Sequence, residues 1–369
     1  MKNTFGNSIA VTVFGESHGE AIGVVIDGLA PGIPVDNNRI EFELSKRRPS
    51  SSIDTPRREP DKFHILSGVF RGKTTGTPLT IIIPNENTKS EDYTYGIARP
   101  SHADYAAFCK YHGFEDYRGG GHFSGRITAG IVAVGGILLP MLENMGIKIG
   151  THILKCGDIT DSAFSDFEKD IDALKNSNFP TISKDCGAKI TEKISETSKK
   201  GDSIGGITQT AVIGMKKGVG EPFFDSLESL LSHALFSIGG IKGVEFGKGF
   251  DFADALGSEC NDEFEIKDGN IGTLTNNNGG INGGISNGMP ILFNCAVKPT
   301  PSISLTQNTV DFVKSENTEI SVKGRHDPAI IRRICPVINS ISAIVIADAL
   351  ASRFGTDIFL KGAEKCSLD

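Results

Sequence analysis

The chain has 369 residues, of which 38% are hydrophobic and 22% charged, so it can bury a sizeable core, and disorder over most of its length is excluded. Its formal net charge is −7, which argues against nucleic acid as a partner because nucleic-acid-binding proteins usually carry a basic field. No apolar run approaches the roughly 20 residues that a membrane helix needs, and the first residues show no secretory pattern, so we expect no membrane partner and a cytoplasmic location.

The predicted elements follow one another in mixed order. Apolar or alternating runs predict strands at 9–14, 22–27, 79–84 and 291–297. Apolar residues at helical spacing predict helices at 126–145, 227–238 and 342–354. The first of these should kink or end early at Pro140, and Gly355 closes the last. The polar segment 160–200 is typical of solvated helices at the periphery.

No regular strand–helix alternation, internal repeat or linker divides this order. We therefore expect one α+β domain over residues 1–369. Its architecture would be a β-α-β sandwich, with helices packed between or against antiparallel sheets.

Several common catalytic motifs fail. GVFRGKT, from Gly68, has three residues between its first glycine and GK where a phosphate-binding P-loop needs four. GxGxxG after a strand, HExxH and GxSxG do not occur, so a dinucleotide fold, a metal hydrolase and a serine hydrolase are unsupported. The seven cysteines are far apart with no CxxC pair, which favours free thiols and no metal site.

A basic cluster stands out in this acidic chain. Its members are Arg39, Lys46, Arg47, Arg48, Arg57, Arg58 and Arg71. Arginine forks bind carboxylates and phosphates in bidentate geometry, although a solvated charged face explains the cluster equally well. Nearby proline and serine residues indicate a loop, where binding residues often lie.

Two histidines occupy predicted loops. His18 lies in GESHG between two strands, and His102 lies in RPSHAD, where Asp104 could orient it. A loop histidine can transfer protons near neutral pH, but a single one is more often a hydrogen-bonded structural residue. His64, His152 and His233 lie in strand-like or helical runs, and we interpret them as structural.

Glycine-rich and proline-rich loops complete the candidate site. RGGGHFSGR (118–126) leads into the helix predicted from residue 126, and a helix start with two arginines can bind an anion. NNNGGINGGISNG (276–288) lets a flat ring or a phosphate approach the backbone, whereas a tight turn is the simpler alternative. KPTPS (298–302) offers an ammonium and two hydroxyls. GRHDP (324–328) offers a carboxylate base at Asp327, or is merely a charged turn.

Together these segments resemble the chorismate synthase family. The matching blocks, in family order, are GESHGEAIGVVIDGLAPG, RREPD, RPSHAD, YRGGGHFSGR, GDSIGG, GEPFFD, NNNGGINGGISNG, KPTPS and GRHDP. The resemblance implies a lyase that eliminates phosphate from 5-enolpyruvylshikimate 3-phosphate in a trans-1,4 sense to give chorismate. It also implies a homotetramer that needs reduced FMN. Because no reductase domain is visible, we expect the monofunctional bacterial type, for which NADPH acts only through an external flavin reductase.

The resemblance also implies roles for residues at matching positions. His18 would protonate the departing phosphate, His102 would lie near the flavin, and Asp327 would help to remove the proton through the flavin N5. The implied substrate ligands are Arg39, Arg47, Arg48, Arg126 and Arg325. The implied flavin ligands are Ser17, Ser124, Gly239, Gly240, Gly283, Lys298, Pro299, Thr300, Pro301, Ser302 and Arg325.

The chain departs from the family pattern in a few places. His122 and Phe123 replace two residues of the common RSSAR block, Ile53 lies where an arginine is frequent, and Asn339 stands where a glutamate is common. Two other functions are weighed. A flavin-binding redox sensor would not need His18, Asp327 and the arginines together, and a flavin-free phosphate lyase or phosphatase would need a nucleophile or a metal.

Overall fold

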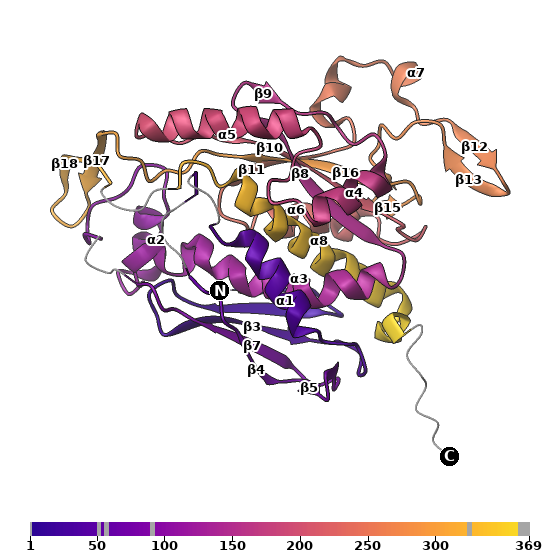
Figure 1. Ribbon diagram of the computed structural model, residues 1–369, viewed down its shortest axis with the longest axis horizontal. Coiled ribbons are helices and arrows are strands. Elements are labelled where there is room, and N and C mark those ends of the chain that lie inside the picture. The colour runs from indigo at the N-terminus through magenta and orange to yellow at the C-terminus, as the bar shows by residue number, and fades with distance from the viewer. Residues whose placement is uncertain (1, 50–52, 55–58, 89–92, 323–326, 361–369) are drawn as a thin grey trace.

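Two antiparallel sheets enclose a layer of helices. The computed structural model describes residues 2–49, 53–54, 59–88, 93–322 and 327–360. One five-stranded sheet has the order β1 (Thr4–Phe5), β2 (Ala10–Gly15), β3 (Ala21–Asp27), β7 (Leu79–Pro84) and β4 (His64–Ser67). The other has the order β11 (Ile241–Phe246), β16 (Ile291–Val297), β10 (Gly206–Ile213), β8 (Lys148–Cys156) and β9 (Ile159–Thr160). The predicted α+β sandwich is confirmed (Figure 1).

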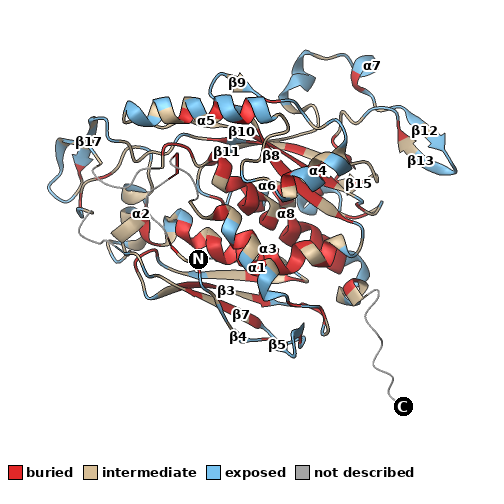
Figure 2. Cartoon of the chain, in the orientation of Figure 1, coloured by how far each residue is buried: buried red, intermediate tan, exposed pale blue. Residues whose placement is uncertain are grey.

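The helices between the sheets are α1 (Asn37–Arg47), α3 (Thr128–Glu143), α6 (Leu227–Leu235) and α8 (Ile331–Phe354). Helix α3 packs on β3 and β7, and α8 packs on β8 and β10. The two helices approach closely at Gly135, which has no side chain: a Cβ there would lie only 2.1 Å from Ser340 Oγ. Their buried residues join those of both sheets in one continuous core, which Figure 2 shows in red.

Outside this core lie α4 (Phe167–Lys175) and α5 (Lys184–Lys199), which cover the second sheet as expected for residues 160–200. Helix α2 (Asp104–Tyr111) and the 3-10 turns η2 (Arg118–Phe123) and η3 (Gly125–Ile127) belong to the loops before α3. The remaining elements are β5 (Val69–Phe70), β6 (Lys73–Thr74), η4 (Phe223–Asp225), η5 (Gly249–Asp254), α7 (Gly257–Cys260), β12 (Phe264–Lys267), β13 (Asn270–Thr273), β14 (Ile281–Asn282), β15 (Ile285–Ser286), β17 (Gln307–Asp311), β18 (Glu316–Ile320) and η6 (Thr356–Leu360).

Two expectations about the central helices need correction. Residues 125–143 and 331–354 are apolar enough to span a membrane by length and mean hydropathy, although none was expected from the sequence. Most of the residues in these segments are buried inside the fold, and a helix that packs on every side is apolar all round. Helix α8 also begins at Ile331 and not at Ser342, whereas α3 ends at Glu143, soon after Pro140.

The first part of the basic cluster, predicted as a loop, is helical, whereas Arg57 and Arg58 lie outside the described residues. Asp36 caps α1, its carboxylate accepting a hydrogen bond from the Asn38 backbone N–H at 2.9 Å. Ile40 and Leu44 anchor the helix in the core with no exposed surface. Helix α1 therefore extends to Arg47. Arg39 lies near its beginning and Arg47 at its end, so the two arginines lie in different parts of the structure.

Candidate active site

A cavity of about 290 Å³ opens where the end of α1 and the beginnings of α3 and α8 meet loops from distant parts of the chain. Among its described lining residues are Arg47, Arg48, Arg99, Ser124, Arg126, Gly239, Ser302, Asp327 and Arg333. Most of these come from the loops that were singled out in the sequence. The cavity thus joins the basic cluster to the predicted flavin loops and to Asp327.

A second hollow of about 480 Å³ adjoins the first, and Tyr93, Arg99 and Val322 line both. Its wall contains His102 and a group of aromatic side chains. These are Tyr93, Tyr95, Tyr117, Phe123 and Phe312. The joined space is therefore rich in arginine at one end, while aromatic and acidic side chains line the other, and its volume suits small ligands.

His18 lies against this joined space. The loop that carries it, between β2 and β3, is fixed by the Ser17 backbone N–H, which donates to the Gly121 carbonyl at 3.1 Å. The Asn85 side-chain amide donates to the carbonyls of Glu16 and Gly19, both at 2.9 Å. The His18 ring is mostly buried and meets the Tyr93 ring edge-on, at 5.4 Å between centroids. His18 is not among the described lining residues of either hollow, but it contacts Tyr93, which lines both.

Two consecutive glycines bring His18 and His102 together. Gly119 and Gly120 adopt left-handed backbone angles, with φ of 61° and 81°. A Cβ at Gly119 would lie 2.5 Å from His18 Nε2, and a Cβ at Gly120 would lie 3.3 Å from His102 Cε1. The glycine run of RGGGHFSGR is thus required for the close approach of both imidazoles, and not only for a turn.

His102 is oriented by a carboxylate, as predicted. Its Nδ1 lies 2.6 Å from Asp104 Oδ1, and Arg99 donates to the same carboxylate from Nε and Nη2 at 2.8 and 2.7 Å. Burial alone would raise the pKa of Asp104, but the hydrogen bonds from Arg99 and His102 hold it well below its usual 3.8. The ionised Asp104 fixes the imidazole so that Nε2 lies toward Gly120.

Arg47 and Arg126 are held by one buried carboxylate. Both pair with Asp61, whose side chain has no exposed surface; Arg47 Nη1 lies 3.3 Å from it. Arg47 also donates to Thr128 Oγ1 at 3.1 Å and to the Gly125 carbonyl at 2.8 Å. Both arginines line the cavity, and protein partners hold their guanidinium groups rigidly.

Arg48 is less engaged. Among the described residues it pairs only with Glu41, which lies 4.0 Å away and is 70% exposed. Its Nη2 also donates to the Glu41 carbonyl at 3.5 Å, and its buried Nε has no hydrogen-bond partner within the described part of the chain. Arg39, by contrast, lies in another cavity and pairs with Glu43 at 2.9 Å and with Glu143 at 3.1 Å. The structure therefore brings Arg47, Arg48 and Arg126 to one cavity and leaves Arg39 outside it.

Asp327 combines an ion pair with an unsatisfied oxygen. It pairs with Arg333, one turn into α8. Its Oδ1 atom is buried and lacks a hydrogen-bond partner among residues that the structure describes. Burial raises the pKa of Asp327 against the opposing effect of Arg333, and the Asp54 carboxylate raises it further. Asp327 thus has a carboxyl group with a raised pKa, and among the described residues its Oδ1 has no partner that would compete with a ligand.

The predicted flavin loops are only partly assembled. Gly239 lines the cavity, and the Lys298 backbone N–H donates to the Gly240 carbonyl at 2.9 Å. Ser124 and Ser302 also line the cavity, whereas Ser17 is buried behind it. In the same segment, Lys298 Nζ donates to the Ser101 carbonyl and the Thr300 carbonyl accepts from Ser203, while Pro299 is exposed and Pro301 is partly buried. Gly283 lies in the turn between β14 and β15 and is not a lining residue, and Arg325 falls outside the described residues.

Several residues of the site were missed as individual ligands. Arg99 and Tyr93 line both hollows, Arg333 pairs with Asp327, and Asp61 joins two arginines. Arg99 lies inside RPSHAD and Asp61 inside RREPD, so the quoted blocks contained a signal for both. Tyr93 and Arg333 lie outside the quoted blocks.

The departures from the family pattern are accommodated locally. The His122 Nδ1 atom lies 2.7 Å from the Gly15 carbonyl and ties the glycine loop to the His18 loop. Phe123 contributes to the aromatic hollow, and Ile53 is buried in the core. Asn339 accepts a hydrogen bond from Thr151 Oγ1 at 2.6 Å and is not among the described residues that line the cavity of Asp327.

Known proteins resemble this chain in both sequence and fold. A family model described as chorismate synthase matches residues 9–351. The chain is 45% identical to the chorismate synthase of Methanosarcina barkeri, over 94% of this chain and 95% of the relative. It is 44% identical to that of Lachnospira eligens, over 94% of both chains. A solved structure described as a chorismate synthase crystal structure superposes with a TM-score of 0.75 at 26% identity, over 97% of this chain and 98% of that one. The chain belongs to the chorismate synthase family.

Proposed function

We propose that the chain converts 5-enolpyruvylshikimate 3-phosphate into chorismate and inorganic phosphate by trans-1,4-elimination, as a lyase of the shikimate pathway to the aromatic amino acids. The observation that carries this proposal is the charge of the Asp327 cavity. Among its described lining residues, five arginines stand beside three carboxylates. A substrate with one phosphate and two carboxylates needs such a local positive excess in a protein whose net charge is −7.

The joined hollow also fits a reduced FMN. Planar rings pack well on aromatic walls, and Tyr93, Tyr95, Tyr117, Phe123 and Phe312 supply such a wall beside His102. A Cβ at Gly239 would meet nothing within 4 Å, so the backbone there is open to a ligand. Bound reduced FMN would supply the electron density that lets phosphate leave from a carbon skeleton with a poorly acidic hydrogen.

The side chains divide the acid and base work. His18 is the proposed acid that protonates the departing phosphate, since its loop is fixed and its ring reaches the cavity wall through Tyr93. Asp327 is the proposed acceptor of the ring proton by way of the flavin N5, because its buried Oδ1 has no hydrogen-bond partner among the described residues. His102 is the proposed residue that holds the flavin in its reduced charge state, oriented by Asp104.

Arg48 is the first choice among the substrate-binding arginines because its guanidinium is the least engaged by the protein. Arg47 and Arg126, which both pair with Asp61, would form a fixed and positively charged wall of the cavity. Arg39 is not part of this proposal, because two carboxylates already pair with it in a different cavity. Lys298 and Ser302, near Gly240 and Arg99, remain proposed flavin ligands.

We also propose a cytoplasmic homotetramer that receives reduced flavin from an external NADPH-dependent reductase. Support for self-association comes from an arm formed by α7, β12 and β13, which projects from the sandwich (Figure 1). Ile266 on this arm is 76% exposed and is accompanied by exposed Phe264, Ile271 and Leu274, an apolar surface of the kind that partners cover. Ile266→Asp should reduce the molecular mass measured by light scattering, whereas Glu265→Gln should not. A mass unaffected by Ile266→Asp would contradict an interface at the arm.

The decisive experiment is a phosphate-release assay without oxygen. Purified chain is mixed with 5-enolpyruvylshikimate 3-phosphate and reduced, oxidised or no FMN. Phosphate and chorismate formed only with reduced FMN support the proposal. Phosphate released without flavin would favour a flavin-free lyase or phosphatase, and flavin binding without release in any arm would favour a redox sensor.

A further inference from the structure

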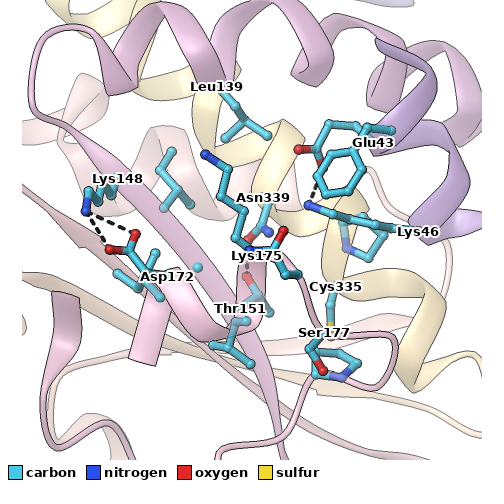
Figure 3. Close-up of a pocket in the computed structure, with 18 of the residues that line it drawn as sticks. Glu43, Lys46, Leu139, Lys148, Thr151, Asp172, Lys175, Ser177, Cys335 and Asn339 are labelled. Atoms are coloured by element: carbon cyan, nitrogen blue, oxygen red, sulfur yellow. Dashed lines mark hydrogen bonds and ion pairs between the residues drawn. The ribbon is translucent and has the colours of Figure 1, made fainter. Parts of the chain in front are cut away.

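A third cavity, of about 480 Å³, lies apart from the site described above. It is enclosed by α1, the end of α3, β8, α4 and the N-terminal part of α8, and it shares no described lining residue with the other two hollows (Figure 3). Its volume falls in the range of small-molecule sites. The proposed elimination gives this cavity no task.

The cavity contains a chain of ion pairs with an excess of positive charge. Lys46 pairs with Glu43 at 2.9 Å, Glu43 with Arg39 at 2.9 Å, Arg39 with Glu143 at 3.1 Å, and Glu143 with Lys175 at 2.9 Å. Three cations therefore share two carboxylates, with a lysine at each end. Glu43 is only 1% exposed, so much of this chain is withdrawn from water, where an uncompensated charge is costly.

The surroundings compensate this excess only at the solvent-exposed rim. There Lys148 shares two carboxylates, Glu168 and Asp172, which are 71% and 55% exposed, while Arg332 is paired with Asp54. Burial lowers the pKa of Lys46, and the charges of Arg39 and Lys175 lower it further although Glu43 opposes them. In Figure 3, Lys175 extends into the cavity between the Lys46–Glu43 pair and the Lys148–Asp172 pair. One further negative charge placed at Lys46 and Lys175 would balance the charges of this chain of ion pairs.

The rest of the lining defines the shape of that anion. Phe42, Leu139, Ile171, Leu174 and Pro180 supply apolar walls of the cavity. Thr151, Ser177 and Asn339 supply neutral polar groups. An inorganic anion would leave the apolar walls in contact with water, whereas a carboxylate on a ring-sized apolar body would cover them.

We propose that this cavity is a second ligand site, which binds a small aromatic monocarboxylate with its carboxylate between Lys46 and Lys175. The occupant lies behind the proposed catalytic cavity, because adjacent residues of α8 serve the two spaces. Arg332 lines this cavity, donates to the Arg48 carbonyl at 3.2 Å and pairs with Asp54 at 2.6 Å, while Arg333 lines the other.

The test measures binding of 4-hydroxybenzoate to the purified full chain by isothermal titration calorimetry, with the uncharged 4-hydroxybenzamide as the matched probe. Lys175→Glu reverses one end of the chain of ion pairs and should weaken 4-hydroxybenzoate binding by about tenfold or more, and Lys46→Gln should act in the same direction. Lys193→Glu is the control, because Lys193 on α5 is 35% exposed, as Lys175 is 34% exposed, and pairs with Asp158 away from the cavity. It should leave the affinity within about twofold.

The expected result is one site per chain that binds the carboxylate, rejects the amide and depends on Lys175. Absence of binding at millimolar probe, equal binding of the amide, or unchanged affinity in both cavity variants would overturn the proposal. A loss in Arg48→Ala as large as that in Lys175→Glu would also overturn it, because the probe would then occupy the Asp327 cavity. None of these outcomes depends on turnover, so they are distinct from failure of the proposed lyase activity.

Discussion

The carboxylate of Asp61 should be the main internal support of the arginine wall, and Asp61→Asn tests this directly. The substitution removes one negative charge and keeps the size of the side chain. Asp61 has a left-handed backbone with φ of 52°, which asparagine adopts as readily as aspartate, so the backbone should not be strained. What changes is the charge between Arg47 and Arg126.

The magnitude follows from burial. The side chains of Arg47, Arg126 and Asp61 are 7%, 3% and 0% exposed. Removing one partner of a buried ion pair costs about 3–5 kcal/mol of stability. The asparagine oxygen can still accept one hydrogen bond, so we expect the free energy of unfolding to fall by about 3 kcal/mol. With a denaturant dependence of about 3 kcal/mol per molar urea, the unfolding midpoint should fall by about 1 M.

The assay is urea unfolding followed by circular dichroism at fixed protein concentration. Asp158→Asn is the matched control, since Asp158 also pairs with a cation, Lys193, at 2.8 Å but is 74% exposed. Its midpoint should not change measurably. An Asp61→Asn midpoint equal to that of the wild type would refute the reasoning, because the two guanidinium groups would then not depend on this carboxylate.

Three further outcomes are expected. His18→Ala should lower turnover by about 10²-fold or more in the anaerobic phosphate-release assay, and near-normal turnover would remove His18 from the mechanism. Arg48→Ala should mainly weaken substrate binding, and an unchanged affinity in a direct titration would make Arg48 a surface residue. Asp104→Asn should destabilise the fold most above about pH 4, because the pKa of Asp104 is held below its usual 3.8 in the folded chain; the difference from wild type should shrink as the pH falls, and a difference independent of pH would contradict the assigned ion pairs.

The sequence predicted most of the framework because its signals are local. Alternation over 79–84 and 291–297 matches β7 and β16 residue for residue. The start of α8 was missed because Pro336 and the charged pair Arg332 and Arg333 interrupt the apolar stripe that identifies residues 342–354. In the fold, Arg332 is buried against Asp54, and Arg333 donates to the Arg47 carbonyl; a local pattern carries no record of such distant partners.

The site shows the same division. The convergence of His18 and His102 was implied by family blocks, but the reason for it, two glycines that each face one imidazole, is visible only in space. Arg39 and Arg48 are close in sequence and were assigned one role, yet α1 places them at different cavities. The sequence showed which side chains are charged, but it did not show which carboxylate pairs with each arginine.

That assignment of partners determines which arginines can bind a ligand. Arg332 and Arg333 are consecutive and chemically identical, but Asp54 holds the first and Asp327 the second, and each also donates to a backbone carbonyl at the end of α1. Hydrogen bonds from α8 thus hold both the Arg47 and the Arg48 carbonyl at the end of α1. Because Arg332 lines one cavity and Arg333 the other, an anion in either cavity lies beside the same junction of α1 and α8. For this reason Arg332→Met, which removes the ion pair to Asp54 and the hydrogen bond to the Arg48 carbonyl at a residue that does not line the Asp327 cavity, should weaken substrate binding. Unchanged substrate affinity in this variant would show that the junction does not position Arg48.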